Sequence, residues 1–361
     1  MFGWVHDRRT KIGLLLVWSC MVAANCAPPP GVDNDNDNDN TVGVARWQLV
    51  LSELPGALLS ASGGSPTDVI AVGSDGEDGE GPLVLRYDGV RWTRIASGAA
   101  NNIWWVNERP VEGDFYMSGE QGLIMRYSPA TGEFEQFETP GTERLFGIWG
   151  MESDNLLAVG GAEPPDSLVT GTIWHFDGLT WSRVDTSNLR EGGIPTMFKV
   201  WGSGADRIYA VGFDGVIYNF NGTEWVDVPS PTTRRLLSVH GSDDLIVAVG
   251  GANTGVIAES VAGADFSDVT PSGLFQMTGL FVPPAGDAVA AGNSGSVAFR
   301  RAAGWQIVNT GLGLDITLGF HGAWVDSEGG IWLTGGDLLA LDRGLLVYFG
   351  TRDVGTELVN E

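Results

Sequence analysis

The sequence predicts an all-β fold in which seven similar units close into a ring, and three observations lead to this prediction. First, a tryptophan or phenylalanine ends a similar sequence segment in each unit, at Trp47, Trp92, Phe134, Trp181, Trp225, Phe266 and Trp305. These residues recur at intervals of 39 to 47 residues, which is the period of a repeat architecture. Second, a glycine ends an apolar run in every unit. Third, the repeat region begins with a single strand, at residues 46–50, and its last unit lacks one strand.

Residues 1–25 have the pattern of a signal peptide. Arg8, Arg9 and Lys11 precede an apolar run over residues 12–24, which is too short to span a bilayer. Cys26 follows this run and resembles the lipidation site of bacterial lipoproteins. Two alternatives remain open: lipidation at Cys20, or simple secretion with Cys26 left as a free thiol. Both cysteines lie in or beside the signal, so the exported domain has no disulfide and depends on its core.

Residues 26–45 contain the predicted lipidation site and a linker. Aspartate and asparagine alternate over residues 33–40, and no apolar residue interrupts them. Such a segment cannot bury enough surface to offset the entropy of ordering, and its like charges keep it extended, which predicts a disordered stalk. The alternative is a calcium loop, but the turn glycine and distal glutamate of an EF-hand are not placed here.

Residues 46–351 contain the repeat, and four strands are expected in each unit. The first strand is an apolar run, as at 145–150, 197–202 and 236–241. The second strand ends in the seven aligned glycines Gly73, Gly119, Gly160, Gly212, Gly250, Gly292 and Gly335. A position that takes glycine in seven divergent copies requires positive φ or close backbone approach. The third strand leads through an Asp-Gly or Asn-Gly hairpin turn to the fourth, which carries the recurring aromatic residue.

The seventh unit supplies the closure of the ring. It has strands at 320–325, 331–335 and 345–350 but no fourth strand, whereas residues 46–50 are a fourth strand without a unit before them. Pairing these elements gives a seven-bladed β-propeller of four-stranded blades, whose last blade is closed by the N-terminal strand at Trp47. An open stack would leave both ends uncapped. Residues 352–361 are expected to form a C-terminal tail.

The composition excludes one class of partner. The formal net charge is −25, so approach to nucleic acid phosphates would add like charge rather than release counterions. We therefore expect no nucleic acid partner, and we expect a monomer, because a closed ring leaves only short sheet edges.

The phrases at 200–212 and 221–225 resemble the repeats of exported bacterial propeller lipoproteins of the BNR/YVTN type and of photosystem II stability/assembly factor-like propellers. The resemblance covers residues 46–350 and implies the fold. It also implies a role at the bacterial cell envelope, as an anchored lipoprotein or a secreted protein. Members of the photosystem group are expected to use an arginine-rich face, whereas this chain is acidic. The Asp box of sialidase propellers is not matched at Asp88, Gly89 and Trp92.

No catalytic motif is present in the sequence. His175, His240 and His321 share no metal-ligand spacing, and the serine-hydrolase elbow, the zinc-protease helix motif and the phosphate-binding loop are missing. We therefore predict no catalytic residue, no metal site and no cofactor.

One column of residues carries a binding hypothesis. If the first strand of each blade lines the channel, aromatic residues at one level of it can stack on a sugar or a peptide. These are Trp105, Trp149, Trp201, His240, Phe281 and Trp324, with Ser62 in the first unit. Lys199 is a candidate for binding an anion. The alternative is that the rings pack between neighbouring blades and fill the wedge between them.

The sequence thus favours a non-enzymatic binding or scaffold propeller with an unknown protein or glycan ligand, tethered to the envelope by a lipid. A carbohydrate-active enzyme is the first alternative, and it requires two or three acids to converge with an arginine or histidine in one pocket. An assembly factor for an envelope complex is the second.

Overall fold

The computed structural model describes residues 43–360 except 77, 108–109 and 163–169. The predicted signal peptide, Cys20, Cys26 and nearly all of the predicted linker lie outside the described residues. Within the described part of the chain, no helix is long and apolar enough to cross a membrane.

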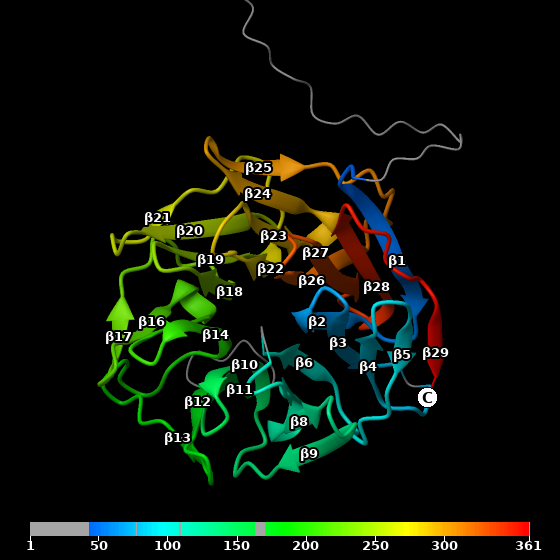
Figure 1. Ribbon diagram of the computed structural model, residues 1–361. Coiled ribbons are helices and arrows are strands. Elements are labelled where there is room, and N and C mark those ends of the chain that lie inside the picture. Colours follow the sequence, from blue (N-terminus) through cyan, green and yellow to red (C-terminus); the bar gives the residue numbers. More distant parts are fainter. Residues whose placement is uncertain (1–42, 77, 108–109, 163–169, 361) are drawn as a thin grey trace, which may run out of the picture. The chain divides into compact units, whose positions relative to one another are not determined.

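Seven sheets surround a common centre, which confirms the predicted seven-bladed β-propeller. Figure 1 shows one strand of each sheet nearest the centre and another at the periphery. The innermost strands are β2 (Leu58–Ser65), β6 (Ile103–Val106), β10 (Arg144–Glu152), β14 (Met197–Gly204), β18 (Leu236–Gly241), β22 (Met277–Phe281) and β26 (Leu318–Val325). The second strands are β3 (Asp68–Asp75), β7 (Phe115–Gly119), β11 (Asn155–Gly161), β15 (Arg207–Gly212), β19 (Leu245–Gly251), β23 (Ala288–Gly292) and β27 (Ile331–Asp337).

The outer half of each blade follows the predicted order. The third strands are β4 (Pro82–Tyr87), β8 (Ile124–Ser128), β12 (Gly171–Phe176), β16 (Ile217–Phe220), β20 (Gly255–Val261), β24 (Val297–Arg301) and β28 (Asp342–Gly350). The fourth strands are β5 (Trp92–Arg94), β9 (Glu133–Phe137), β13 (Trp181–Arg183), β17 (Trp225–Val228), β21 (Ser267–Asp268), β25 (Gly304–Val308) and, for the last blade, β1 (Arg46–Leu54). Short 3-10 turns η1 (Glu120–Gly122), η2 (Phe213–Gly215) and η3 (Asn293–Gly295) join the second and third strands of blades 2, 4 and 6.

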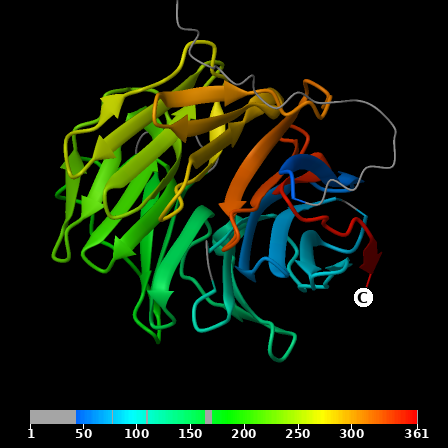
Figure 2. The same ribbon diagram turned by 45° about the horizontal axis from the view of Figure 1, so that its top comes forward.

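The last blade contains both ends of the propeller. Strand β1 pairs antiparallel with β28, and Trp47 lies opposite Phe349. Figures 1 and 2 show the blue first strand beside strand β28 of this sheet. The predicted closure at Trp47 is therefore confirmed.

The seven aligned glycines are explained by close backbone approach. None of them has a positive φ. A Cβ atom on Gly160 would lie 1.9 Å from the Arg144 carbonyl oxygen, and one on Gly335 would lie 2.0 Å from the Gly319 carbonyl oxygen. In both blades the obstructing carbonyl belongs to the start of the innermost strand, so a side chain here would push two paired strands apart.

The end of the chain differs from the sequence prediction. Residues 352–361 were expected to form a tail, but Leu358–Asn360 forms β29, which pairs in parallel with β5. Blade 1 therefore has five strands. The apolar side chains of Leu358 and Val359 in β29 are half-buried. The edge of β5 has unpaired backbone N–H and C=O groups, and the backbone of β29 pairs with them.

The core lies between neighbouring blades. Trp92 of blade 1 is fully buried and meets Trp332 of blade 7 with ring centroids 6.0 Å apart. Trp305 of blade 6 donates its indole N–H to Glu259 of blade 5. The recurring tryptophans thus join each blade to its neighbour.

Candidate binding site at the top of the channel

Every innermost strand contains a β-bulge near its start. Between β10 and β11 the register passes from Leu145 to Gly147 and leaves Phe146 without a partner in the ladder. The other six blades have the same shift, and the seven extra residues are Leu59, Trp104, Phe146, Phe198, Leu237, Thr278 and His321. A bulge changes the direction in which a side chain points. Here the repeated bulge presents one side chain per blade at the same end of the channel.

Six of these seven residues, all except Leu59, line one cavity of about 700 Å³. Part of its remaining wall comes from loops between second and third strands, including Ala252, Asn253 and the segment from Asp337 to Ala340. Another part comes from residues just before the innermost strands, including Arg235 and Ile316. We call this end of the ring, at which the innermost strands begin, the top face. A cavity of this volume is large enough to hold several side chains of a ligand.

An aromatic arc forms part of the cavity wall, and it consists of Trp104, Phe146, Phe198 and His321. The ring centroids of Trp104 and Phe146 are 5.4 Å apart, and those of Phe146 and Phe198 are 5.2 Å apart. His321 closes the arc at 5.8 Å from Trp104. The Arg144 guanidinium lies 5.0 Å from the centroid of Trp104. Four blades therefore supply a continuous surface on which an apolar or planar group can stack.

Lys199 lies at the floor of the cavity, and its side chain is 3% exposed. Its Nζ is 2.9 Å from the centroid of the Trp105 ring and donates a long hydrogen bond of 3.4 Å to the Phe146 carbonyl oxygen. No carboxylate among the described residues forms an ion pair with it. Burial lowers the pKa of Lys199 well below its usual range, because the charged ammonium loses its hydration.

His321 stands beside this lysine. Its Nδ1 lies 2.6 Å from the Leu59 carbonyl oxygen, to which the Nδ1–H donates. Burial, together with the nearby charge of Lys199, lowers the pKa of His321 to about 4. At neutral pH the imidazole is therefore uncharged, and the bond to Leu59 leaves Nε2 as an acceptor.

Two exposed apolar residues mark the rim of the cavity. Ile316 and Leu339 both line it, and they are 76% and 99% exposed. Arg235 is held in the wall by hydrogen bonds to Gly251 O at 2.9 Å and to Gln276 Oε1 at 2.8 Å. Asp337 is the only acid among the described lining residues, and its Oδ1 accepts the backbone N–H groups of Leu339 and Ala340.

The column of residues predicted from the sequence is placed differently from this cavity. Trp149, Trp201 and Trp324 are buried, and their rings reach the next blade at Gly202, Gly241 and Gly63. This is the packing between blades that the sequence left as an alternative. His240 follows the same pattern: its ring packs at a tilt against Trp201 and Phe281, with centroids 5.1 Å and 4.3 Å away. Its Nδ1 also accepts the Val282 N–H at 3.1 Å.

The alignment of Trp105 with that column is wrong by two residues. Trp105 pairs with Ser118, the residue before the aligned glycine of its second strand. Lys199 pairs with Val211, the residue before the aligned glycine of blade 4, so Trp105 and Lys199 are equivalent positions. Asn107 takes the place of the blade-packing aromatic residue, and its Nδ2 donates to the Gly150 carbonyl oxygen at 3.1 Å. The two adjacent tryptophans of this strand conceal the register, because either one satisfies an apolar pattern.

Beneath Lys199 the channel narrows. Trp105, Trp149, Trp201 and His240 line a second space of about 10 Å³, and Lys199 lines this space as well. Such a volume holds one water molecule at most. A ligand therefore reaches the floor from the top face.

Sequence reasoning missed the aromatic arc. Phe146, Phe198 and His321 each stand three residues before a member of the predicted column. One signal was present: two large apolar or aromatic residues adjoin at the start of these strands, as at Leu145–Phe146 and Phe320–His321, and this breaks the alternation expected of a regular strand.

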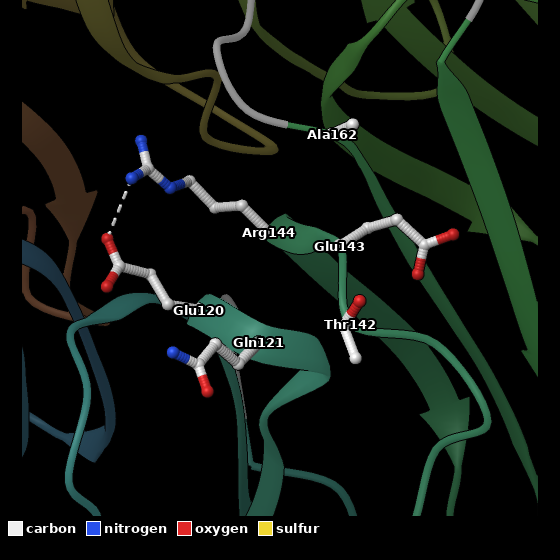
Figure 3. Close-up of a pocket in the computed structure, with 6 residues that line it drawn as sticks. All are labelled: Glu120, Gln121, Thr142, Glu143, Arg144 and Ala162. Carbon is white, nitrogen blue, oxygen red and sulfur yellow. Dashed lines mark ion pairs between the residues drawn. The ribbon is translucent and has the colours of Figure 1, made fainter.

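A second cavity of about 380 Å³ lies on the top face between blades 2 and 3 (Figure 3). Arg144 forms an ion pair with Glu120 at 2.9 Å, and Glu120 also accepts from Asn102 at 3.0 Å. Figure 3 shows the Glu143 carboxylate directed away from this pair. Glu120 is therefore held by Arg144 and Asn102, while the Glu143 carboxylate lies apart from this pair in the same cavity.

Comparison with known proteins finds one relative by sequence and several solved structures with the same fold. No family model matches the chain. A segment is 34% identical over 154 residues to the immune protein Tsi7 of Pseudomonas aeruginosa, and this match covers 41% of the chain and about half (49%) of that relative. Among solved structures, YCF48 from Cyanidioschyzon merolae superposes with a TM-score of 0.63 at 14% identity, over 86% of this chain and 100% of that one.

Two further solved structures have the same fold. A structure described as YCF48 bound to D1 peptide gives a TM-score of 0.61 at 15% identity, over 87% of this chain and 99% of that one. The WD40 repeats of RRP9 give 0.64 at 8% identity, over 85% and 98% of the two chains. This chain therefore has the β-propeller fold of YCF48 and of the WD40 repeats of RRP9.

Proposed function

We propose that this chain is a non-enzymatic binding protein that holds a segment of a partner protein in the cavity of its top face. The observation that carries the proposal is the combination of the aromatic arc inside the cavity with Ile316 and Leu339 at its rim. Exposed apolar residues that adjoin an apolar cavity extend its surface into one patch, and such patches mark interaction sites. Burial of such residues by a partner is the usual source of affinity at protein interfaces.

Two comparisons support a protein as the partner. YCF48, which has the same fold, is described in one structure as bound to a peptide. The relative Tsi7 is named an immune protein. We further propose that the site operates at the bacterial cell envelope, since the signal-like N-terminus and Cys26 favour export and lipidation.

Site-specific photo-crosslinking tests the proposal in cells that express the full chain. A photoreactive amino acid replaces Leu339 on the rim, and a matched control replaces Leu179, which is 87% exposed in an outer hairpin turn. We expect a discrete crosslinked protein from position 339 and none from position 179. Mass spectrometry then identifies the partner.

A second pair of variants tests whether the apolar rim provides the affinity. Ile316→Asp places a charge on the rim, and Val90→Asp places one at a turn of similar exposure, 76% against 73%. We expect the first variant to reduce crosslinking from position 339 at least tenfold and the second to leave it unchanged. Equal crosslinking from positions 339 and 179, or no loss with Ile316→Asp, overturns the proposed function. Hydrolysis of a glycan by the purified chain would overturn it in favour of an enzyme.

A further inference from the structure

Lys199 is a buried basic residue in the wall of the central channel. It belongs to the residues that follow the bulge in each innermost strand, which are Ser60, Trp105, Gly147, Lys199, Ser238, Gly279 and Gly322. The other six are uncharged. A buried charge in a protein is normally paired with an opposite charge, yet the contacts of the Lys199 ammonium are the Trp105 ring and one long hydrogen bond to a carbonyl.

The shape of the channel determines where a counter-charge can come from. Lys199 lines both the large cavity above and the narrow space below. The lower space is lined by Trp149, Trp201 and His240 among others and has a volume of about 10 Å³, too small for a carboxylate. The upper cavity has a volume of about 700 Å³ and lies open to the top face. An anion can therefore approach the ammonium from above.

The charges around the upper cavity favour an anion, although the whole chain is strongly acidic. Lys199 and Arg235 are the basic residues of the described lining, and His321 beside Lys199 is uncharged at neutral pH. The acid of this lining, Asp337, already accepts two backbone N–H groups at the loop that follows it. The walls therefore present more positive than negative charge to a ligand.

Trp104 contributes a second buried donor to the lining of the cavity. The indole Nε1 of Trp104 is buried, and no hydrogen-bond acceptor reaches it among the described residues. A buried donor left without an acceptor costs free energy. Trp104 belongs to the arc that lines the cavity, so its N–H and the Lys199 ammonium are two buried donors at the same end of the channel.

We propose that the floor of the top-face cavity is a carboxylate site, in which Lys199 binds the carboxylate of a ligand while the aromatic arc packs against the adjoining apolar group. The inference rests on the proposed function and specifies its ligand: a segment that carries an apolar or aromatic side chain next to a carboxylate. The carboxylate is either the C-terminus of the partner chain or an acidic side chain within it.

Three small probes test the inference with the whole chain. N-acetylphenylalanine carries an aromatic ring and a terminal carboxylate, and N-acetylphenylalaninamide is its uncharged counterpart. N-acetylglutamic acid α-amide carries the carboxylate on a side chain. In chemical-shift titrations we expect N-acetylphenylalanine to bind at least tenfold more tightly than its amide. Tighter binding of N-acetylglutamic acid α-amide than of N-acetylphenylalaninamide assigns the site to an acidic side chain as well as to a chain end.

Substitutions test whether Lys199 causes the tighter binding of the acid than of the amide. Lys199→Met keeps the length of the side chain and its contact with Trp105 but removes the charge, so the preference for the acid falls below twofold. Arg301→Met removes a half-exposed cation on the outer part of blade 6 and leaves the preference unchanged. Equal binding of acid and amide by the unaltered chain overturns the inference, and this comparison needs no variant to fold. A preference that survives Lys199→Met overturns it too.

The two proposals fail separately. If the crosslinks at position 339 depend on Ile316 but acid and amide bind equally, the carboxylate site is wrong and the protein-binding function stands. If the acid is preferred through Lys199 but no protein crosslinks at position 339, the carboxylate site stands and its ligand is a free small molecule.

Discussion

Trp47 in β1 and Phe349 in β28 lie opposite each other, with ring centroids 4.7 Å apart, although 302 residues separate them in the sequence. Phe299 of the neighbouring blade lies 6.4 Å from Trp47. One side chain near the start of the described chain thus joins the two ends of the propeller and contacts the preceding blade. A ring closed in this way depends on its closing strand more than on any other edge strand.

We therefore expect Trp47→Ala to destabilise the whole propeller. Loss of a half-buried tryptophan and its two aromatic contacts should lower the free energy of unfolding by about 3 kcal/mol. Urea denaturation monitored by fluorescence measures this change. Trp47→Phe keeps an aromatic ring against Phe349 and should cost less than half as much; equal losses from the two variants would show that the aromatic contact is not the cause.

Close approach at the second-strand glycines gives another prediction. A Cβ atom on Gly160 meets the Arg144 carbonyl oxygen at 1.9 Å, so Gly160→Ala must separate β10 from β11. We expect a loss of on the order of 3 kcal/mol in the free energy of unfolding. Gly64→Ala is the matched control, because the nearest atoms to its Cβ are side-chain atoms at 3.5 and 3.8 Å. It should change the stability by less than about 0.5 kcal/mol, and similar losses in both would contradict the explanation.

The sequence predicted the ring and its closure because both depend on patterns that repeat. Seven aligned glycines and the unmatched strand at Trp47 each leave a trace in the residue order. The cavity could not be predicted in this way. It is built by a bulge that adds one residue to each innermost strand, and a bulge changes the direction of Phe146 or His321 without changing its residue type. Lys199 was named as an anion candidate, but its burial depends on rings from other blades.

His321 makes the stability depend on pH. Its pKa in the folded chain is about 4, against 6.5 for a free histidine, because burial and Lys199 disfavour the charged form. The unfolded chain therefore binds more protons between these values, so stability rises with pH from about 4 to 6.5 and is constant above that. The full difference corresponds to about 3 kcal/mol, and we expect about 2 kcal/mol because His321 is partly exposed.

A comparison of two chains isolates this effect from the many carboxylates that titrate nearby. His321→Asn retains a donor for the Leu59 carbonyl oxygen but does not titrate. As the pH falls from 6.5 to 4, the unaltered chain should lose about 2 kcal/mol more of its free energy of unfolding than this variant does. A difference that does not vary with pH would show that His321 is charged or solvated in the folded chain.

The proposed envelope location depends on Cys26, which lies outside the described residues, and fractionation of cells tests it. If Cys26 is lipidated, the chain should sediment with membranes and label with a radioactive fatty acid, because a lipid-bearing cysteine anchors the propeller through the segment over residues 27–45. Cys26→Ala should then release the chain into the soluble fraction and abolish the label, whereas Cys20→Ala should alter neither. The reverse pattern would assign lipidation to Cys20. A chain that remains soluble without any substitution would instead favour simple secretion, because no acyl group would be present to hold the acidic propeller near an anionic membrane surface.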